Sequence, residues 1–237
     1  MGLRVVAALV MLLGCAPPAV LAQGSASAAR PDLSGYWELR FDSFNVPAAA
    51  LTAQAQAAAE ARRKKDLEAI RGCVNIGMPA LMNDRATLDI RQSAGVIGMV
   101  AKSPSSTRYV YTDGRKHPDA EELEGTTNGH SVGRWDGGTL VVDTVGFNER
   151  GITAIPGGGY RTARSRLTEQ YRLAADGQQL VVTFTWTDAT VFRRPHAYSF
   201  RYYKVPSISE PRVTNCIAND AERARFLTEA PAPAPAR

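Results

Sequence analysis

Hydrophobic and polar residues alternate with a period of two along most of the chain after residue 84, which is the pattern of β-strands with one buried face. Leu88 and Ile90, for example, alternate with Asp89 and Arg91. Short turn sequences separate such runs. Together with an earlier run that begins at Tyr36, the pattern predicts strands over residues 36–41, 88–91, 96–102, 107–112, 128–135, 139–145, 164–173, 178–187 and 191–203.

The links between these runs indicate how the strands are arranged. Asp136-Gly137 and Asp176-Gly177 each lie between neighbouring runs, and Asp-Gly is a strong signal for a hairpin turn. Strands joined mostly by short links predict a mainly β fold, either an antiparallel barrel or a strongly curled sheet. One N-terminal helix is expected over residues 46–71, which are rich in Ala, Gln, Glu, Arg and Lys and precede Gly72. The pattern also allows a short helix at 219–227.

The first residues have the features of a signal peptide. Arg4 precedes a short apolar run, and Val20-Leu21-Ala22 places small residues where a signal peptidase cleaves. Residues 1–22 are therefore expected to be removed, which makes the protein periplasmic or secreted. In an alternative reading, residues 12–15 form a lipobox and a lipid on Cys15 anchors the protein to a membrane. We favour the first reading because Leu13 is a poor residue immediately before the small one.

The rest of the chain divides into a linker at 23–30, a single domain at 31–229 and a Pro/Ala tail at 230–237, which should be extended and unpacked. Cys73 and Cys216 remain if Cys15 leaves with the signal peptide. An even number of cysteines in an oxidising compartment predicts a disulfide between them. Two buried free thiols are the alternative.

Charge and composition narrow the classes of function. The formal net charge is +5, and Lys and Arg are dispersed apart from residues 62–65, which lie in the expected helix and are interpreted as a solvated face. No stripe of aromatic and basic residues is present, so nucleic-acid binding is not expected. The three histidines are scattered and form no zinc-spaced pair. Nucleophile-elbow, phosphate-loop and dinucleotide motifs are absent, so no metal and no bound cofactor are expected.

The hairpin at 128–145 brings together a first pair of candidate catalytic residues. His130 and Asp143 are directly opposite if Asp136-Gly137 forms the turn, and they are diagonal neighbours if the turn is Gly137-Gly138. Either register leaves them on one face of the sheet. A carboxylate beside an imidazole raises its basicity, which suits a general base. The alternative is an ordinary cross-strand pair on a solvated face.

Glu169 is a second candidate because it lies on the apolar face of its strand. Its neighbours on that face are Leu167 and Tyr171, whereas Thr168 and Gln170 lie on the other face. A buried carboxylate must be paired or have a raised pKa, and a raised pKa is what an acid catalyst needs. The alternative is an interior Glu–Arg pair.

The turn at 113–118 contributes Arg115, whose planar guanidinium could hold a carboxylate at the mouth of a barrel. A solvated Arg in a polar turn is the alternative. The glycine-flanked Ser131 lies on one face with Trp135, which could be a ligand-binding wall or a place where the indole packs on backbone. The candidate ligand-binding residues are Tyr36, Trp37, Trp135, Tyr171 and His117.

Two resemblances bear on these candidates. Gly35-Tyr36-Trp37 is similar to the Gly-x-Trp motif at the start of lipocalin-like barrels. The blocks at 73–79, 111–118 (with Asp113-Gly114-Arg115 and His117-Pro118) and 129–144, with Cys216 and Asn219, resemble a group of secreted bacterial proteins for which the resemblance implies no activity. Gly138 and Gln170 depart from that pattern, in which Asp and Arg are expected.

Two hypotheses follow for a small-molecule partner. In the first, the protein is a cofactor-free, lyase- or decarboxylase-like enzyme that acts on a small aromatic or carboxylate-bearing molecule in the lumen. Glu169 would donate a proton, His130 and Asp143 would form the base, and Arg115 would bind the carboxylate. Phenolic acid decarboxylases resemble this arrangement in using Tyr, Arg and Glu inside a lipocalin-like barrel. In the second, the barrel binds an apolar ligand without chemistry. Convergence of Glu169, His130 and Arg115 on one cavity would favour the enzyme. The sequence does not indicate an oligomeric state.

Overall fold

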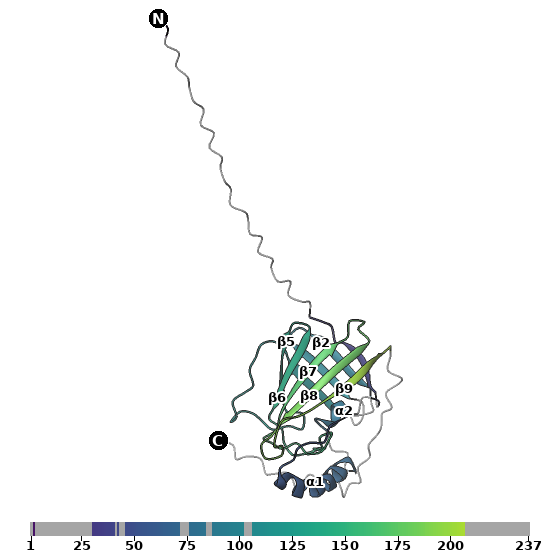
Figure 1. Cartoon of the computed structure of the whole chain (residues 1–237), viewed down its shortest axis with the longest axis vertical. Helices are drawn as coiled ribbons and strands as arrows, with labels where there is room; N and C mark the ends of the chain where they lie inside the picture. The colour runs from purple at the N-terminus through teal and green to yellow at the C-terminus, as the bar shows by residue number, and fades with distance from the viewer. Residues whose placement is uncertain are drawn as a thin grey trace.

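The computed structural model describes residues 2, 30–40, 42, 46–71, 76–83, 87–101 and 106–206. Within this part of the chain, nine strands follow one another around a closed barrel (Figure 1). The strands are β1 (Gly35–Leu39), β2 (Leu88–Ser93), β3 (Val96–Ala101), β4 (Ser106–Tyr111), β5 (His130–Asp136), β6 (Thr139–Val145), β7 (Arg166–Leu173), β8 (Gln179–Thr187) and β9 (His196–Val205). The helices are α1 (Ala53–Arg71) and α2 (Ala80–Asn83). The expectation of a mainly β, lipocalin-like barrel with one N-terminal helix is confirmed.

Closure of the barrel depends on β1, which pairs with β2 on one side and with β9 on the other. All neighbouring pairs are antiparallel except β4 and β5, which run parallel. The expectation of a purely antiparallel barrel is wrong for this one pair. The physical reason is the connection at 112–129, which is long enough to return the chain to the opposite end of the barrel before β5 begins.

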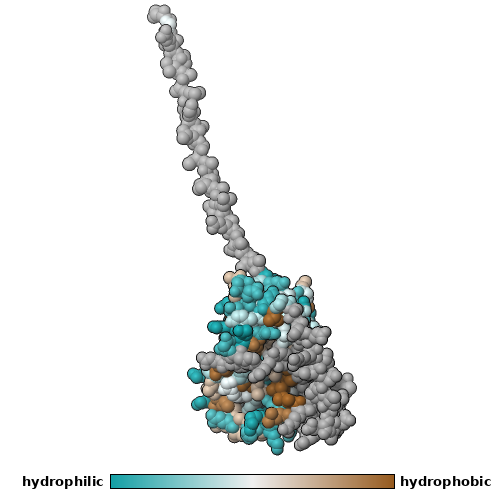
Figure 2. All heavy atoms as spheres, turned by 90° about the vertical axis from the view of Figure 1, so that its right-hand side faces the viewer, coloured by the Kyte–Doolittle hydropathy of each residue, from teal (hydrophilic) through white to brown (hydrophobic). Residues whose placement is uncertain are grey.

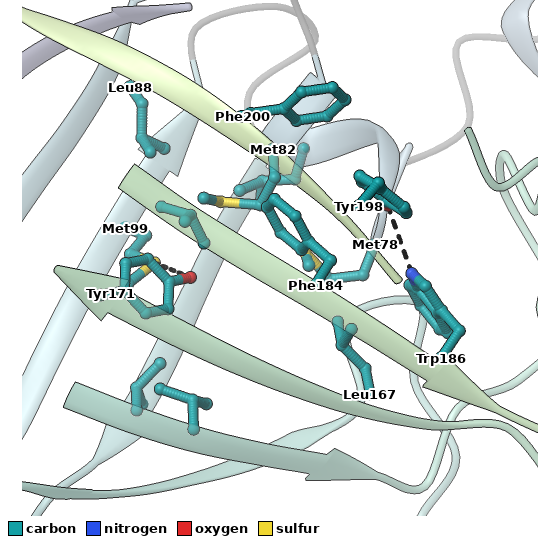
Figure 3. Close-up of a cluster of buried hydrophobic side chains, with 14 of the residues drawn as sticks. Met78, Met82, Leu88, Met99, Leu167, Tyr171, Phe184, Trp186, Tyr198 and Phe200 are labelled. Atoms are coloured by element: carbon teal, nitrogen blue, oxygen red, sulfur yellow. Dashed lines mark hydrogen bonds between the residues drawn. The ribbon is translucent and has the colours of Figure 1, made fainter. Parts of the chain in front are cut away.

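Strand alternation fills the barrel with apolar side chains. Residues of β7 and β8 alternate between buried and more exposed positions along their length. Figure 3 shows aromatic and methionine side chains from several strands meeting in the interior, among them Phe184, Phe200 and Met99. The short helix α2 adds Met82, whose carbonyl oxygen accepts a 2.6 Å hydrogen bond from Tyr202 Oη. The barrel is therefore packed rather than hollow at this level.

The two ends of the barrel differ. The turns β2–β3, β5–β6 and β7–β8 lie at one end, which we call the hairpin end. Helix α1 lies beyond the opposite end, which we call the helix end (Figure 1). Helix α1 begins at Ala53, later than expected, because residues before it are extended and Leu51 bridges to Phe192. Thr52 Oγ1 then caps the helix by accepting a 3.1 Å hydrogen bond from the Ala55 amide.

The basic run at 62–65 is only partly a solvated face. Arg63 and its two lysine neighbours are exposed, as expected. Arg62 instead turns toward the barrel, where its guanidinium lies over the Tyr160 ring and pairs with Glu149 at 2.6 Å. Within the described ranges, no helix has both the length and the apolar character needed to cross a membrane.

Several expectations concern residues outside those that the structure describes. These are the signal peptide and linker, the alternative lipid on Cys15, the disulfide between Cys73 and Cys216, the helix at 219–227 and the tail at 230–237. They stay predictions.

Candidate functional site

Glu169 lies in the interior of the barrel, where it pairs with Arg108 of β4. Arg108 is 2% exposed and Glu169 is fully buried. Arg108 Nη1 donates to Glu169 Oε1 at 2.9 Å, and Nη2 donates to Oε2, so the pair is bidentate. Tyr171 Oη adds a 2.8 Å hydrogen bond to Oε1. We call Arg108, Glu169 and Tyr171 the interior cluster.

The remaining donors of Arg108 are also satisfied. Its Nε donates to Ser131 Oγ at 3.1 Å, and Nη2 donates to Thr144 Oγ1 at 2.8 Å. Burial, the largest single effect, lowers the pKa of Arg108, but the charges and hydrogen bonds of Glu169 and Tyr171 together outweigh burial and raise the pKa. Burial raises the pKa of Tyr171 well above its ordinary value, and the carboxylate of Glu169 adds to this effect. The cluster is thus an ion pair with a neutral phenol, closed on itself by hydrogen bonds.

The inward position of Glu169 was expected, and an interior Glu–Arg pair was the stated alternative to catalysis. The arginine itself was not identified from the sequence. A signal was present, because Arg108 lies two residues before Val110 in a strand of period two, on the same face as this apolar residue. A basic and an acidic residue that are both on inward faces are expected to pair.

A second group of polar side chains lies on the outer wall of the barrel, over β4, β5 and β6. We call it the outer cluster, and its members are Tyr111, Arg115, His117, His130, Asp143 and Arg166. Hydrogen bonds link four of its members in series, from His130 through His117 and Asp143 to Arg166. His130 Nδ1 lies 2.8 Å from His117 Nδ1, and His117 Nε2 lies 3.0 Å from Asp143 Oδ2. Arg166 binds both oxygens of Asp143, at 2.6 Å through Nε and 2.7 Å through Nη2.

The register of the β5–β6 hairpin explains why His117 lies between the expected pair. Asp136 pairs with Thr139, so Gly137-Gly138 is the turn and Val132, not His130, lies opposite Asp143. His130 and Asp143 are therefore diagonal neighbours on one face, as the second of the two registers predicts. The diagonal separation leaves room for a third side chain. His117 supplies it from the connection at 112–129, whose path the strand pattern does not determine.

Arg115 belongs to the same cluster but is held by its own turn. Asp113 Oδ2 accepts from Arg115 Nε at 2.9 Å and from its Nη2 at 2.5 Å. The guanidinium lies 3.9 Å from the centre of the Tyr111 ring, which stacks on His130 at 5.4 Å. Burial, followed by the charges of His117 and Arg115, lowers the pKa of His130 below its ordinary value.

The three principal candidates do not converge on one cavity. Glu169 points inward from β7, whereas His130 and Arg115 lie on the outer wall. The candidate ligand-binding residues are similarly dispersed. Trp37 is fully buried and donates from its indole to the Leu33 carbonyl at 3.0 Å. Tyr36 lies on the outer wall against Arg91, whose guanidinium is 4.8 Å from the Tyr36 ring centre.

Trp135 differs from the other aromatic candidates because it lines an open cleft at the hairpin end. We call this the mouth cleft, and its volume is about 360 Å³. It lies between the β2–β3 turn, the segment that leads into β1, and the ends of β4 and β5. Its lining residues are Arg30, Asp32, Gln92, Ser93, Ala94, Gly95, Ile97, Thr112 and Trp135.

Backbone contacts hold the walls of the mouth cleft in place. Gln92 Oε1 accepts from the Leu33 amide at 3.1 Å, and Gln92 Nε2 donates to the Pro31 carbonyl at 3.2 Å, which ties β2 to the start of the domain. Gly95 adopts a φ of 82° in the β2–β3 turn, and its carbonyl accepts from the Thr112 amide at 2.8 Å. The left-handed conformation favours glycine at this position. The cleft is therefore preformed.

A smaller cavity of about 290 Å³ lies at the helix end, between α1 and the segment at 160–164. Its two arginines are Arg62 and Arg164. The Arg62 guanidinium is already neutralised by Glu149, and Tyr160 is nearly buried beneath it. This cavity therefore offers less to a ligand than the mouth cleft does.

Comparisons with known proteins do not add a function. No family model matches the chain, and no curated protein sequence matches it. Among the described residues, no group of three or more His, Cys, Asp and Glu side chains is arranged to hold a metal ion.

Proposed function

We propose that the protein is an exported small-molecule-binding barrel and that the mouth cleft is its binding site. The observation that carries this proposal is the combination of an indole wall, a guanidinium and a preformed cleft at the open end of a closed barrel. Ligand sites are typically concave, preformed and located at such mouths. The volume of about 360 Å³ suits a molecule with one aromatic ring.

The chemistry of the lining supports a small aromatic carboxylate as the ligand. Trp135 presents a half-buried ring face for stacking. Arg30 makes no hydrogen bond or ion pair within the described residues, so its guanidinium is available for a carboxylate. Hydrogen bonds from Ser34 lower the pKa of Asp32, which keeps this carboxyl ionised at the rim. A second negative charge on the ligand would be repelled there, so monocarboxylates are favoured.

The arrangement of the interior cluster favours binding over catalysis in the lumen. Both oxygens of Glu169 accept hydrogen bonds from Arg108, and Tyr171 donates to one of them. A proton donor must reach its substrate within hydrogen-bond distance. Glu169 could do so only by leaving a buried arginine without its partner, which costs several kcal/mol, on the order of 3–5. Lyase-like chemistry at Glu169 is the less supported function.

Calorimetric titration of the purified mature protein tests the proposal. The two ligands are benzoate and its uncharged analogue benzamide. We expect benzoate to bind and benzamide to bind more weakly. Arg30→Gln should weaken benzoate binding by about fivefold to tenfold, the range for loss of one charged hydrogen bond at a solvated site. Trp135→Ala should weaken both ligands.

Arg134→Gln is the matched control, because Arg134 is an exposed arginine on the opposite face of β5 from Trp135. It should leave both affinities unchanged. Binding that is insensitive to Arg30 and Trp135 would place the ligand elsewhere and overturn the assignment of the mouth cleft.

A further inference from the structure

The outer cluster contains a chain of two imidazoles that ends on a carboxylate, and its hydrogen bonds determine both tautomers. Asp143 is a hydrogen-bond acceptor, so His117 Nε2 donates to it. In a neutral ring the other nitrogen, Nδ1, is then an acceptor. It lies 2.8 Å from His130 Nδ1, which must therefore carry the hydrogen. The basic lone pair of His130 is left on Nε2.

His130 Nε2 has no hydrogen-bond partner among the described residues, and it is not among the buried atoms that lack one. It lies at the end of the chain of hydrogen bonds, on a side chain that is partly exposed. When His130 Nε2 takes up a proton, His130 can pass its Nδ1 proton to His117 Nδ1. The positive charge then lies on His117, next to the carboxylate of Asp143. Asp143 stabilises this imidazolium without taking a proton itself, as the aspartate of a Ser-His-Asp triad does.

We propose that the Asp143–His117–His130 chain is a general-base site for the hydrolysis of small esters, distinct from the mouth cleft. The proposal does not depend on the proposed ligand binding, because the two sites share no residue. Arg115 supplies the second group that such a reaction needs. Its Nε and Nη2 bind Asp113, while its Nη1 has no partner among the described residues and is free to donate to a carbonyl oxygen.

The reaction balances with water as the only co-reactant. His130 Nε2 takes a proton from water as the water oxygen bonds to the ester carbonyl carbon, and Arg115 Nη1 donates to the carbonyl oxygen as it becomes negative. The carbon–oxygen bond to the alcohol then breaks. The departing oxygen takes the proton back from His130 Nε2, which leaves a carboxylic acid and an alcohol.

The charges around His130 set the pH range of this site. On the positive side are Arg115 next to Tyr111, Lys116 in the same turn, and Arg166, which shares Asp143 with His117. On the negative side are Asp113, bound to Arg115, and Asp143. Two adjacent imidazoles repel a second proton, and the pKa of His130 is lowered by burial, His117 and Arg115. The base is therefore available at neutral pH, and the rate should rise with pH to a plateau.

Hydrolysis of 4-nitrophenyl acetate by the full chain tests the site. We expect His130→Gln to lower the rate at least about a hundredfold, which is the usual contribution of a general base. His117→Gln keeps the base but removes the ring that accepts the Nδ1 proton of His130, so it should lower the rate less and shift the pH profile. Arg115→Gln should lower the rate at every pH. Arg134→Gln, outside the cluster, is the control and should change nothing.

A wild-type rate equal to that of His130→Gln would overturn the proposal, and so would a loss in His130→Gln no larger than that in Arg134→Gln. Nitrogen-15 NMR of the two imidazoles gives a readout that does not depend on turnover or on the folding of variants. The proposal requires hydrogen on Nε2 of His117 and on Nδ1 of His130. The opposite tautomer of either ring would contradict it.

Discussion

Arg108 and Glu169 form an ion pair in the interior of the barrel. Both are charged, both are removed from solvent, and each satisfies the other through two hydrogen bonds. Taking such charges out of water is costly, and only complete pairing compensates for this cost. Replacement of one of the two residues should therefore destabilise the fold more than replacement of both.

Glu169→Gln should lower the free energy of unfolding by about 3 kcal/mol or more, because Arg108 would remain buried without a counter-charge. Urea unfolding monitored by circular dichroism measures this change. Gln170→Ala on the outward face of the same strand is the control and should stay within about 0.5 kcal/mol of the wild type. Replacement of Arg108 and Glu169 together by Met should cost less than Glu169→Gln alone. A Glu169→Gln protein as stable as the wild type would show that the pair contributes nothing.

His130 makes stability depend on pH. Its pKa in the folded protein lies below the ordinary value of about 6.5. At pH values between the two, the unfolded chain binds more protons than the folded one, so the free energy of unfolding rises with pH. The stabilisation is complete above the pKa of His130 in the unfolded chain. It is lost as the pH falls toward the pKa of His130 in the folded protein.

His130→Gln should therefore have a flatter stability profile than the wild type between about pH 5 and 7. Thermal unfolding at half-unit pH intervals measures both profiles. Parallel profiles for the two proteins would show that His130 does not respond to its charged neighbours in this way.

At the residue scale, the alternation pattern predicted on which face of the sheet a side chain lies, but not which other side chains it contacts. The period of two placed Glu169 inside and placed His130 and Asp143 on one face, because alternation alone determines which way a side chain points. It did not identify His117 as the link between them. His117 lies in a connection without periodicity, where turns and tertiary contacts, rather than a repeating pattern, determine the path.

At the scale of elements, the attachment of α1 depends on one buried carboxylate. Asp66 Oδ1 accepts hydrogen bonds from the Thr153 amide and hydroxyl, both at 2.9 Å, and Oδ2 accepts from the Ala154 amide at 2.8 Å. Nearby, the buried Arg161 donates to the Met78 carbonyl at 2.7 Å, and burial lowers its pKa to about 10. Side chains thus satisfy backbone groups where strand pairing ends.

Asp66→Ala should destabilise the protein by about 1–3 kcal/mol, because it removes the acceptor of the buried Thr153 amide and of the Ala154 amide. Amide hydrogen exchange should become faster at those two residues before it changes in the strands. Lys64→Ala on the exposed side of α1 is the matched control and should alter neither quantity. Unchanged protection of both amides in Asp66→Ala would contradict this role for the carboxylate.

The elements themselves were largely predictable, with one instructive exception. Residues 139–145 form β6 with the expected bounds, because short turns and strict alternation define both of its ends. The parallel pairing of β4 and β5 was not predicted. A long connection can return to either end of a barrel, and only packing against the rest of the molecule decides between the two.

At the scale of the whole molecule, the charged clusters and the mouth cleft lie in different parts of the barrel. Charged pairs occupy the interior and the outer wall, while the mouth cleft opens at the hairpin end. The face drawn in Figure 2 is mainly hydrophilic toward the hairpin end of the barrel. A polar rim around a single indole favours an amphipathic ligand over a purely apolar one.

A predicted disulfide between Cys73 and Cys216 would act on the whole molecule, although both residues lie outside those that the structure describes. The bond would close a loop of more than a hundred residues and could stabilise the fold by about 4 kcal/mol, because it restricts the unfolded chain. Peptide mapping of the exported protein without reductant should recover the two peptides joined. Recovery of both cysteines as alkylated thiols would contradict the pairing.

The central claim, that the mouth cleft binds a small aromatic carboxylate, is tested most directly by the indole N–H signals of Trp37, Trp135 and Trp186 in an NMR titration with benzoate. Trp37 and Trp186 are fully buried, and only Trp135 lines the cleft. Trp135→Phe identifies its signal by removing it. We predict that this signal shifts progressively and saturates while the other two stay in place. A titration that leaves the Trp135 signal unchanged, or moves only a buried indole, would contradict the claim.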